Sequence, residues 1–234
     1  MNSAAIYKKA LRRKRTYSLV TVCTVLSALL ATGGAGWWRG DQVAEEQLQE
    51  TRILSNVPYA EYFIQYAPEA GLDWHMVAAV AYHESRYNPA AHSRSGACGI
   101  MQLMPRTAQR FGLNDSTLWE PEDNIRAGVH YIKRLQEQFV FIPDSAERLR
   151  FVLASYNAGP AHIHDARRLA REYGDNPYRW NDVETWLTRL DDPQYYNDSL
   201  VLYGAFRAGE TTRYVHSVLR TYDRILAADT LTLP

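Results

Sequence analysis

Residues 74–105 read WHMVAAVAYHESRYNPAAHSRSGACGIMQLMP, and this stretch decides the fold. Asp73 stands directly before it and is a typical helix N-cap residue. Within residues 74–85, apolar side chains recur at the i, i+3 and i+4 spacing of one helix face, and the next residue on that face is Glu84. The stretch therefore predicts a helix over 74–85 whose apolar face ends in a carboxylate.

The position of Glu84 predicts an unusual carboxyl group. An apolar helix face removes part of its hydration, and the negative end of the helix dipole lies beside it. Both effects disfavour the charged form and raise the pKa, as a general acid working near neutral pH requires. The alternative is a solvated carboxylate at a frayed helix end, which is the commoner state of a helix-terminal Glu.

The rest of the chain is also helical in pattern. Glycine and proline residues separate its apolar-periodic segments, and no long alternating run indicates a strand. We predict one mainly α domain of irregularly packed helices over residues 56–230. Its expected helices cover 57–69, 74–85, 106–111, 122–139, 146–158, 160–173, 181–190, 195–206 and 210–227.

The amino-terminal part has the pattern of a membrane anchor. Residues 1–16 hold six Lys and Arg and no acid, and residues 17–38 carry no charge. A helix of that length spans about 33 Å, close to the thickness of a bilayer's hydrocarbon core. We expect residues 1–16 in the cytoplasm, 17–38 as one transmembrane helix in a bacterial inner membrane, 39–55 as a polar linker, and the body in the periplasm. The alternative is secretion after cleavage of a signal peptide.

Composition and spacing exclude several classes of function. The 26 basic and 26 acidic residues balance, so a nucleic-acid partner is not expected. The two cysteines have no zinc-ligand spacing. His162, His164 and Asp165 do not form a metal motif, because His-x-His on a helix points the two rings apart. No nucleotide-binding glycine motif is present, and we predict neither a metal nor a cofactor.

Residues 93–105 contain two glycines that allow sharp turns, and place Gln102 between two methionines. Together with Glu84-Ser85 and Asn88-Pro89, this stretch resembles the lytic transglycosylase family, whose fold is the helical, lysozyme-like fold of the goose type. Three more blocks follow in the family's order, at 124–129, 155–160 and 210–215, so the resemblance covers about residues 58–226.

The stretch 180–207 is most similar to a membrane-bound subfamily. In that subfamily a solute-binding-like domain precedes the catalytic part. These 234 residues leave no room for it, which argues against a ligand-regulated role.

The resemblance implies an enzyme that cleaves the β-1,4 bond between MurNAc and GlcNAc in peptidoglycan glycan strands and forms a 1,6-anhydroMurNAc end. Glu84 would act first as the acid and then as the base. The family pattern implies that the substrate contacts come from Ser93, Gln102, Met104, Tyr156, Asn157 and Tyr214.

Two other functions stay open: a goose-type muramidase, which is a hydrolase, and a catalytically silent peptidoglycan-binding anchor. A hydrolase of the usual kind needs a second carboxylate. The sequence offers several candidates without choosing among them: Glu120, Glu122, Asp123, Asp182, Glu184 and Glu210.

Overall fold

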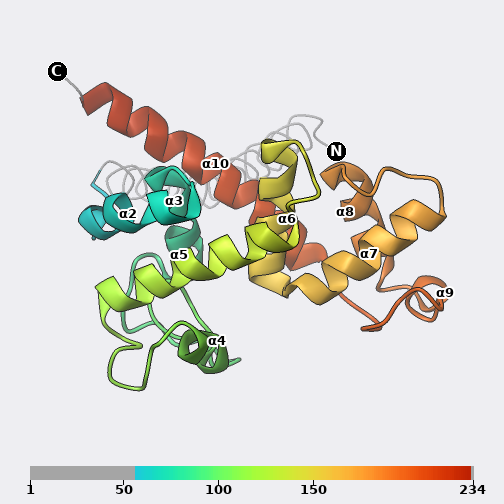
Figure 1. Cartoon of the computed structure of the whole chain (residues 1–234), viewed down its shortest axis with the longest axis horizontal. Coiled ribbons are helices and arrows are strands. Elements are labelled where there is room, and N and C mark those ends of the chain that lie inside the picture. Colours follow the sequence, from blue (N-terminus) through green and yellow to red (C-terminus); the bar gives the residue numbers. More distant parts are fainter. Residues whose placement is uncertain (1–55, 233–234) are drawn as a thin grey trace, which may run out of the picture. The chain divides into compact units, whose positions relative to one another are not determined.

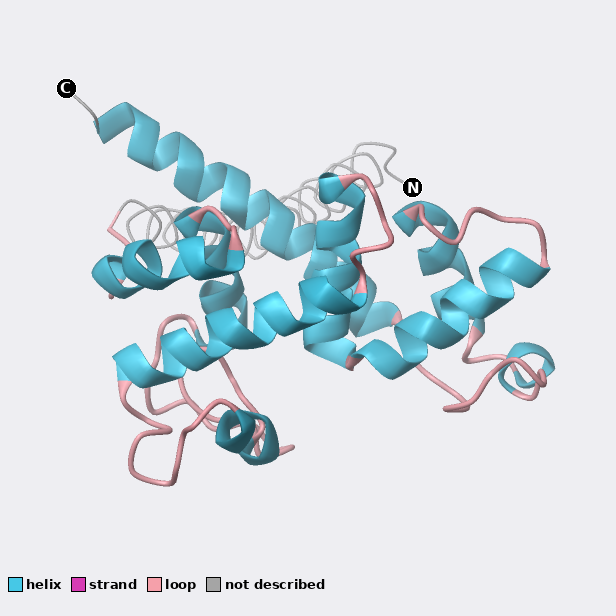
Figure 2. Cartoon of the chain, viewed as in Figure 1, coloured by secondary structure: helices cyan, strands magenta, loops and turns pink. Residues whose placement is uncertain are grey.

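The computed structural model describes residues 56–232, which fold into helices joined by turns and loops (Figure 1). In chain order the elements are α2 (Ala60–Tyr66), a short 3-10 helix η1 (Ala67–Ala70), α3 (Trp74–Ser85), α4 (Pro105–Arg110), α5 (Pro121–Gln138), α6 (Ser145–Ala158), α7 (Pro160–Glu172), α8 (Trp180–Arg189), α9 (Pro193–Tyr196) and α10 (Gly209–Thr232). Figure 2 shows only helices and loops over these residues. The mainly α class is therefore confirmed.

Helix α3 is the central element. Residues 75–82 are all buried, so the helix is enclosed on every side rather than along one stripe. It packs against α10 and α2, and α10 also packs against α6. The largest fully buried aromatic side chains come from several helices and loops: Phe63, Tyr82, Phe139, Phe151 and Trp180.

The ends of α3 place Glu84 in its last turn. Asp73 caps the start, because its carboxylate accepts a hydrogen bond from the backbone N–H of His75 at 3.0 Å. Arg86 and Tyr87 follow the helix with φ of 55° and 63°, a left-handed conformation that ends helices. The prediction of a helix over 74–85 is confirmed at both ends.

The other predicted helices from 106–111 to 181–190 agree with the structure to within one residue at each end. The last helix, predicted over 210–227, begins one residue earlier than predicted, at Gly209, and extends further, to Thr232. The single helix expected over 57–69 is wrong at its start, because Tyr59 has a left-handed φ of 62°. Its last three residues belong to the 3-10 helix η1.

The helix expected over 195–206 is wrong. Only α9 is helical there, and residues 197–208 form turns and loop. The helix does not form because two of its backbone N–H groups donate to a side chain elsewhere in the fold. Those of Leu202 and Tyr203 donate to the carboxylate of Asp165, at 2.9 and 3.0 Å, instead of to carbonyls one turn back.

The predicted basic segment, transmembrane helix and linker lie outside the described residues. Within residues 56–232, no helix combines the length and the apolar character needed to cross a bilayer.

Candidate active site

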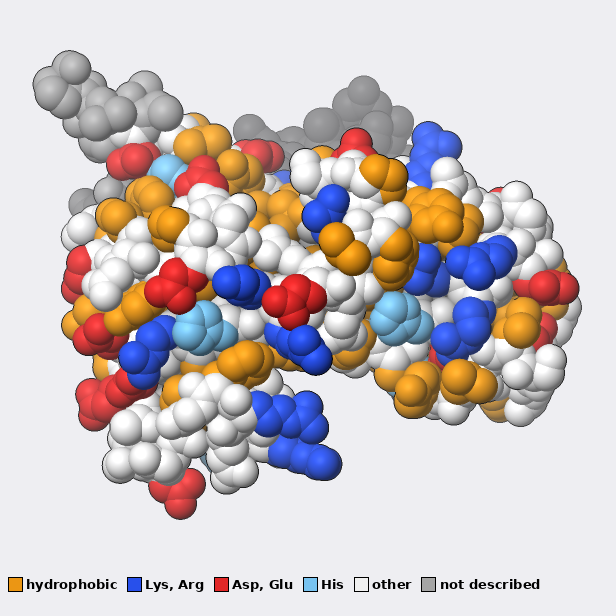
Figure 3. All heavy atoms as spheres, in the orientation of Figure 1, with side chains coloured by type: hydrophobic (Ala, Val, Ile, Leu, Met, Phe, Trp, Pro, Cys, Tyr) orange, Lys and Arg blue, Asp and Glu red, His pale blue; other side chains and the backbone are white. Residues whose placement is uncertain are grey.

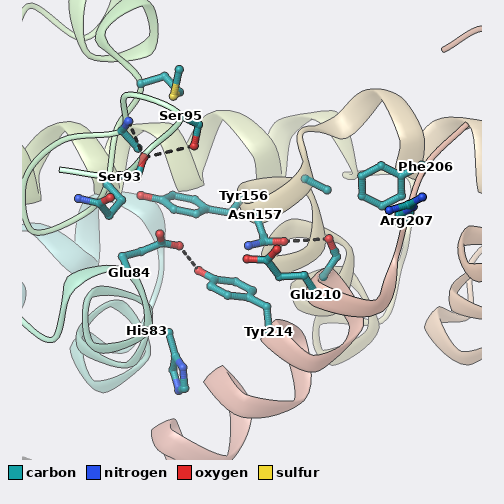
Figure 4. A pocket seen from close by; sticks show the side chains of 15 residues that line it. His83, Glu84, Ser93, Ser95, Tyr156, Asn157, Phe206, Arg207, Glu210 and Tyr214 are labelled. Carbon is teal, nitrogen blue, oxygen red and sulfur yellow. Dashed lines mark hydrogen bonds between the residues drawn. The ribbon is translucent and has the colours of Figure 1, made fainter. Parts of the chain in front are cut away.

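A cavity of about 570 Å³ lies among four segments: the end of α3, residues 93–104, the end of α6, and residues 206–214 (Figure 4). The space-filling view in Figure 3 shows a notch between the surface around α4 and the surface around α7. All seven residues that the sequence analysis named for the site line this one cavity: Glu84, Ser93, Gln102, Met104, Tyr156, Asn157 and Tyr214.

Glu84 has the perturbed carboxyl group that its helix pattern predicts. The residue keeps part of its surface open to the cavity, while protein surrounds most of the carboxylate. Burial raises the pKa of Glu84 to about 7, the hydroxyl of Tyr214 lowers it, and the charge of Glu210 raises it. That hydroxyl donates to Glu84 Oε1 at 2.6 Å. Burial, more than any other cause, therefore keeps a proton on Glu84 near neutral pH.

This raised pKa predicts a pH-dependent stability that the Glu84→Gln variant lacks. In the folded chain the pKa of Glu84 is about 7, against an ordinary value of 4.5. The folded state therefore gains stability from binding this proton, and that gain is complete below pH 4.5 and is lost as pH rises through 7. The stability of the wild type relative to Glu84→Gln should fall by at most about 3 kcal/mol over that window. Urea unfolding of both full chains at several pH values measures the difference. A constant difference would contradict a raised pKa.

Tyr156 lies beside Glu84 at the end of α6, and its hydroxyl has a partner of its own. It donates to the backbone carbonyl of Met101 at 2.7 Å. Burial raises the pKa of Tyr156 well above its usual range, and the nearby charge of Glu84 raises it further. The phenol therefore stays protonated and connects α6 to the segment that forms the opposite wall (Figure 4).

The buried side chain of Asn124 organises the glycine-containing segment. Its Oδ1 accepts a hydrogen bond from the backbone N–H of Met101 at 2.8 Å, and its Nδ2 donates to the carbonyl of Leu118 at 2.8 Å. The backbone of Gly99 lies against this side chain, so an added Cβ would stand 2.3 Å from the Asn124 amide nitrogen. Only glycine fits there. Asn124 begins the family block at 124–129, but the sequence pattern did not indicate that its side chain would hold residues 99–101 in place.

Gln102 reinforces the same segment. Its φ is 47°, an uncommon value for a residue with a side chain. Its Nε2 donates to the carbonyls of Ala91 and Gly99, each at 2.9 Å. The side chain that lines the cavity therefore also holds the turn together.

Ser85 attaches this segment to α3, the helix that carries Glu84, since its hydroxyl donates to the carbonyl of Ile100 at 2.7 Å. Ser93 Oγ accepts from the N–H of Ala97 at 2.9 Å. Met104 is 45% exposed at the cavity. The wall thus offers a hydroxyl and a thioether to a ligand.

On the other side, Asn157 joins α6 to α10. Its Oδ1 accepts a hydrogen bond from the hydroxyl of Thr211 at 2.8 Å. This contact fixes the start of the helix that supplies Tyr214, and therefore the direction from which the Tyr214 hydroxyl reaches Glu84.

The structure also adds cavity residues that the sequence analysis did not assign. His83 is one of them, although its side chain points away from Glu84 (Figure 4). Its Nε2 lies 2.8 Å from the hydroxyl of Thr221 on α10. Phe206, at the end of the stretch that was predicted to be helical, and Arg207, directly after it, also line the cavity.

Among the carboxylates considered as a second catalytic group, Glu210 is the one that lines the cavity in the described chain. It is exposed there, in contrast to Glu84. In residues 56–232 no group of three His, Cys, Asp or Glu side chains is arranged to hold a metal ion.

Residues 61–178 match the family model described as the transglycosylase SLT domain. The chain belongs to this family. It is 40% identical over 173 residues to the membrane-bound lytic murein transglycosylase F of Desulfosudis oleivorans, covering 74% of this chain and 37% of that protein. It is 38% identical over 183 residues to the protein of the same name from Shewanella frigidimarina, covering 77% of this chain and 37% of that protein. The SLT chain thus spans about a third of the length of these curated relatives.

A solved structure of an inactive mutant of lytic transglycosylase Slt from Pseudomonas aeruginosa has a similar fold. Its TM-score is 0.55 at 24% identity, covering 74% of this chain and 25% of that one. The expected helical fold of a lytic transglycosylase is therefore confirmed. The resemblance to the membrane-bound subfamily is confirmed by the names of the relatives of this SLT chain.

Proposed function

We propose that this SLT-family chain is a peptidoglycan lytic transglycosylase that breaks the β-1,4 bond between MurNAc and GlcNAc. The observation that carries the proposal is a single carboxyl group, Glu84, held at the cavity wall with a pKa of about 7. Relatives at about 40% identity that are named lytic murein transglycosylases support the substrate class.

In the first step, protonated Glu84 donates its proton to the glycosidic oxygen. The bond between that oxygen and C1 of MurNAc breaks, and the GlcNAc end leaves with a hydroxyl group. The positive charge that develops at C1 is stabilised by the carbonyl oxygen of the N-acetyl group on the same sugar. A raised pKa makes this proton available near neutral pH.

In the second step, the Glu84 carboxylate removes the proton from the C6 hydroxyl of MurNAc. The C6 oxygen then forms a bond to C1, which closes the 1,6-anhydro ring. Glu84 ends the cycle protonated, as it began, and no water is consumed. One carboxylate suffices because the sugar supplies both the stabilising carbonyl and the attacking oxygen.

The other cavity residues receive positioning and binding roles in this proposal. Tyr214 holds the Glu84 carboxyl group through its 2.6 Å hydrogen bond. Tyr156 and Asn157 shape the corner that orients the N-acetyl group. The contacts with the neighbouring sugars come from Ser93, Gln102 and Met104, which form the opposite wall.

A goose-type muramidase is the second candidate, and the exposed Glu210 in the cavity is the observation that favours it. A second carboxylate could activate a water molecule on the opposite face of the sugar. Mass spectrometry of peptidoglycan digested by the full chain separates the two. We expect anhydro-muropeptides; products one water heavier would establish a hydrolase. Absence of any cleavage in a zymogram would leave a peptidoglycan-binding anchor.

For the amino-terminal residues we propose one membrane span over 17–38, with 1–16 in the cytoplasm, 39–55 as linker and 56–230 in the periplasm. The membrane-bound names of the relatives support this placement. Protease added to spheroplasts should digest the periplasmic body and leave its remnant in the membrane fraction. Recovery of the intact body in the soluble periplasmic fraction would instead indicate a cleaved signal peptide.

The Tyr214→Phe variant should shift the pH dependence of cleavage. The Tyr214 hydroxyl lowers the pKa of Glu84, so its removal raises that pKa above its value of about 7. Because the protonated acid starts the reaction, the alkaline limb of kcat/KM should move to higher pH by up to about one unit. Tyr178→Phe, an exposed tyrosine outside the cavity, is the control. A limb that moves to lower pH would contradict the assigned hydrogen bond.

A further inference from the structure

The segment between α9 and α10, residues 197–208, reaches the cavity at Phe206 and Arg207. Contacts with α7 on the side away from the cavity hold it in place. Asp165 on α7 is fully buried, and its carboxylate accepts the backbone N–H groups of Leu202 and Tyr203. Arg168, which also pairs with Asp165, donates to the carbonyl of Leu200 at 2.7 Å. The segment therefore has a defined path without being helical.

The anchoring continues up to the cavity. The backbone N–H of Phe206 donates to the carbonyl of Leu190 at 2.9 Å, and its ring stacks on His162 with the centroids 4.5 Å apart. Ala208, on the other side of Arg207, is buried. Arg207 thus combines a backbone fixed on both sides with a side chain that is 91% exposed.

Arg207 is the one Lys or Arg among the described residues that line the cavity. Its protein partner is Asp191, with 3.6 Å between Nε and Oδ1, and the Asp191 side chain is 62% exposed. An ion pair this open to water is weak, so a ligand can replace it. A guanidinium group binds carboxylates through two parallel hydrogen bonds.

Figure 4 places Arg207 and Phe206 at the end of the cavity away from Glu84, with Asn157 and Glu210 between them. A ligand group at Arg207 is therefore remote from the bond that Glu84 would cleave. Such a contact exists in the bound substrate as well as in the transition state, and acts mainly on binding.

We propose that Arg207 binds a free carboxylate of the peptide stem attached to the glycan strand. This inference rests on the proposed function, because it takes peptidoglycan as the substrate. The sugar rings, their hydroxyls and their N-acetyl groups are uncharged. In a strand that carries stems, the lactyl carboxyl of MurNAc is itself consumed in the bond to the peptide. The anions that such a strand offers to a cationic cavity end are therefore those of the stem.

The test compares three forms of the same glycan strands, cleaved by the full chain. One form carries stems with free carboxylates, the second carries stems whose carboxylates have been converted to carboxamides, and the third has had its stems removed, which exposes the lactyl carboxylate. The variants are Arg207→Ala, Arg207→Lys and, as a matched control, Arg134→Ala. Arg134 is also an exposed arginine in an exposed ion pair, and it lies outside the cavity.

For Arg207→Ala we expect kcat/KM on the first form to fall about fivefold to tenfold, mostly through KM, as loss of a charge-assisted contact in a partly hydrated site predicts. Cleavage of the carboxamide form should change less than twofold. The wild type should prefer the first form to the second by a similar factor. Arg207→Lys should retain part of that preference, and Arg134→Ala should match the wild type on all three forms.

Two results would overturn the proposal while leaving lytic cleavage intact. One is an equal loss on the first and second forms, which would give Arg207 a role that no stem carboxylate explains. The other is a loss on the stripped strands as large as on the first form, which would assign the contact to the lactyl carboxylate. If the wild type cleaves none of the three forms, the proposed function fails and this inference fails with it.

Discussion

The Glu84→Gln variant should lose glycan cleavage by a factor of about 10²–10⁴, the usual contribution of a positioned general acid–base. Gln has nearly the same shape and can keep the hydrogen bond with Tyr214, but it has no proton to donate and cannot act as a base in the second step. The loss should appear in kcat, with little change in strand binding. The rate of release of anhydro-muropeptides from purified peptidoglycan measures it.

Glu210→Gln is the matched carboxylate variant from the same cavity. In the single-acid account its cleavage stays within about tenfold of the wild type, far above that of Glu84→Gln. Because the charge of Glu210 raises the pKa of Glu84, its removal should also move the alkaline limb of kcat/KM to lower pH. A loss as large as that of Glu84→Gln would favour the two-carboxylate hydrolase. Near-normal turnover in Glu84→Gln would remove Glu84 from its role.

Gly99→Ala is expected to be the most destabilising single methyl addition in the cavity wall. Gly99 has a φ of 79°, and its new Cβ would stand 2.3 Å from the buried Asn124 amide. The strained backbone costs about 1–2 kcal/mol, and displacement of a packed side chain adds about 1–3 kcal/mol. The displaced Asn124 would also release the Met101 N–H. Activity should fall together with stability, because this segment forms the wall opposite Tyr214.

Gly96→Ala is the matched control, since Gly96 lies in the same segment with a φ of 92° and nothing within 4 Å of an added Cβ. This variant should lose only the backbone part, about 1–2 kcal/mol. Urea unfolding of the two full chains gives the comparison. Equal destabilisation would show that Asn124 does not constrain the segment.

The local features of the fold could be predicted from the sequence because their causes are local. The N-cap at Asp73, the apolar face that ends at Glu84, and the glycine and proline breaks all act within a few residues. The predicted carboxyl group with a raised pKa follows from the same helix. The family blocks then named the remaining site residues, which the structure brings together around one cavity.

What the sequence could not predict depends on contacts between distant residues. The buried carboxylate of Asp165 accepts N–H groups from Leu202 and Tyr203, and so replaces the helix expected at 195–206. Nothing in the local pattern of that stretch signals a partner 37 residues earlier. Arg207 was missed for the same reason, because its position at the cavity depends on the non-helical path of residues 197–208. Likewise, Asn124 reaches Met101 across 23 residues.

The most direct test of the central claim is the pKa of the Glu84 carboxyl group in the folded full chain. It can be measured by ¹³C NMR of Glu-labelled protein, with Glu84→Gln identifying the signal. We predict a titration near pH 7. A titration near the ordinary value of 4.5 would show a hydrated carboxylate with no proton to give at neutral pH, and would contradict the account.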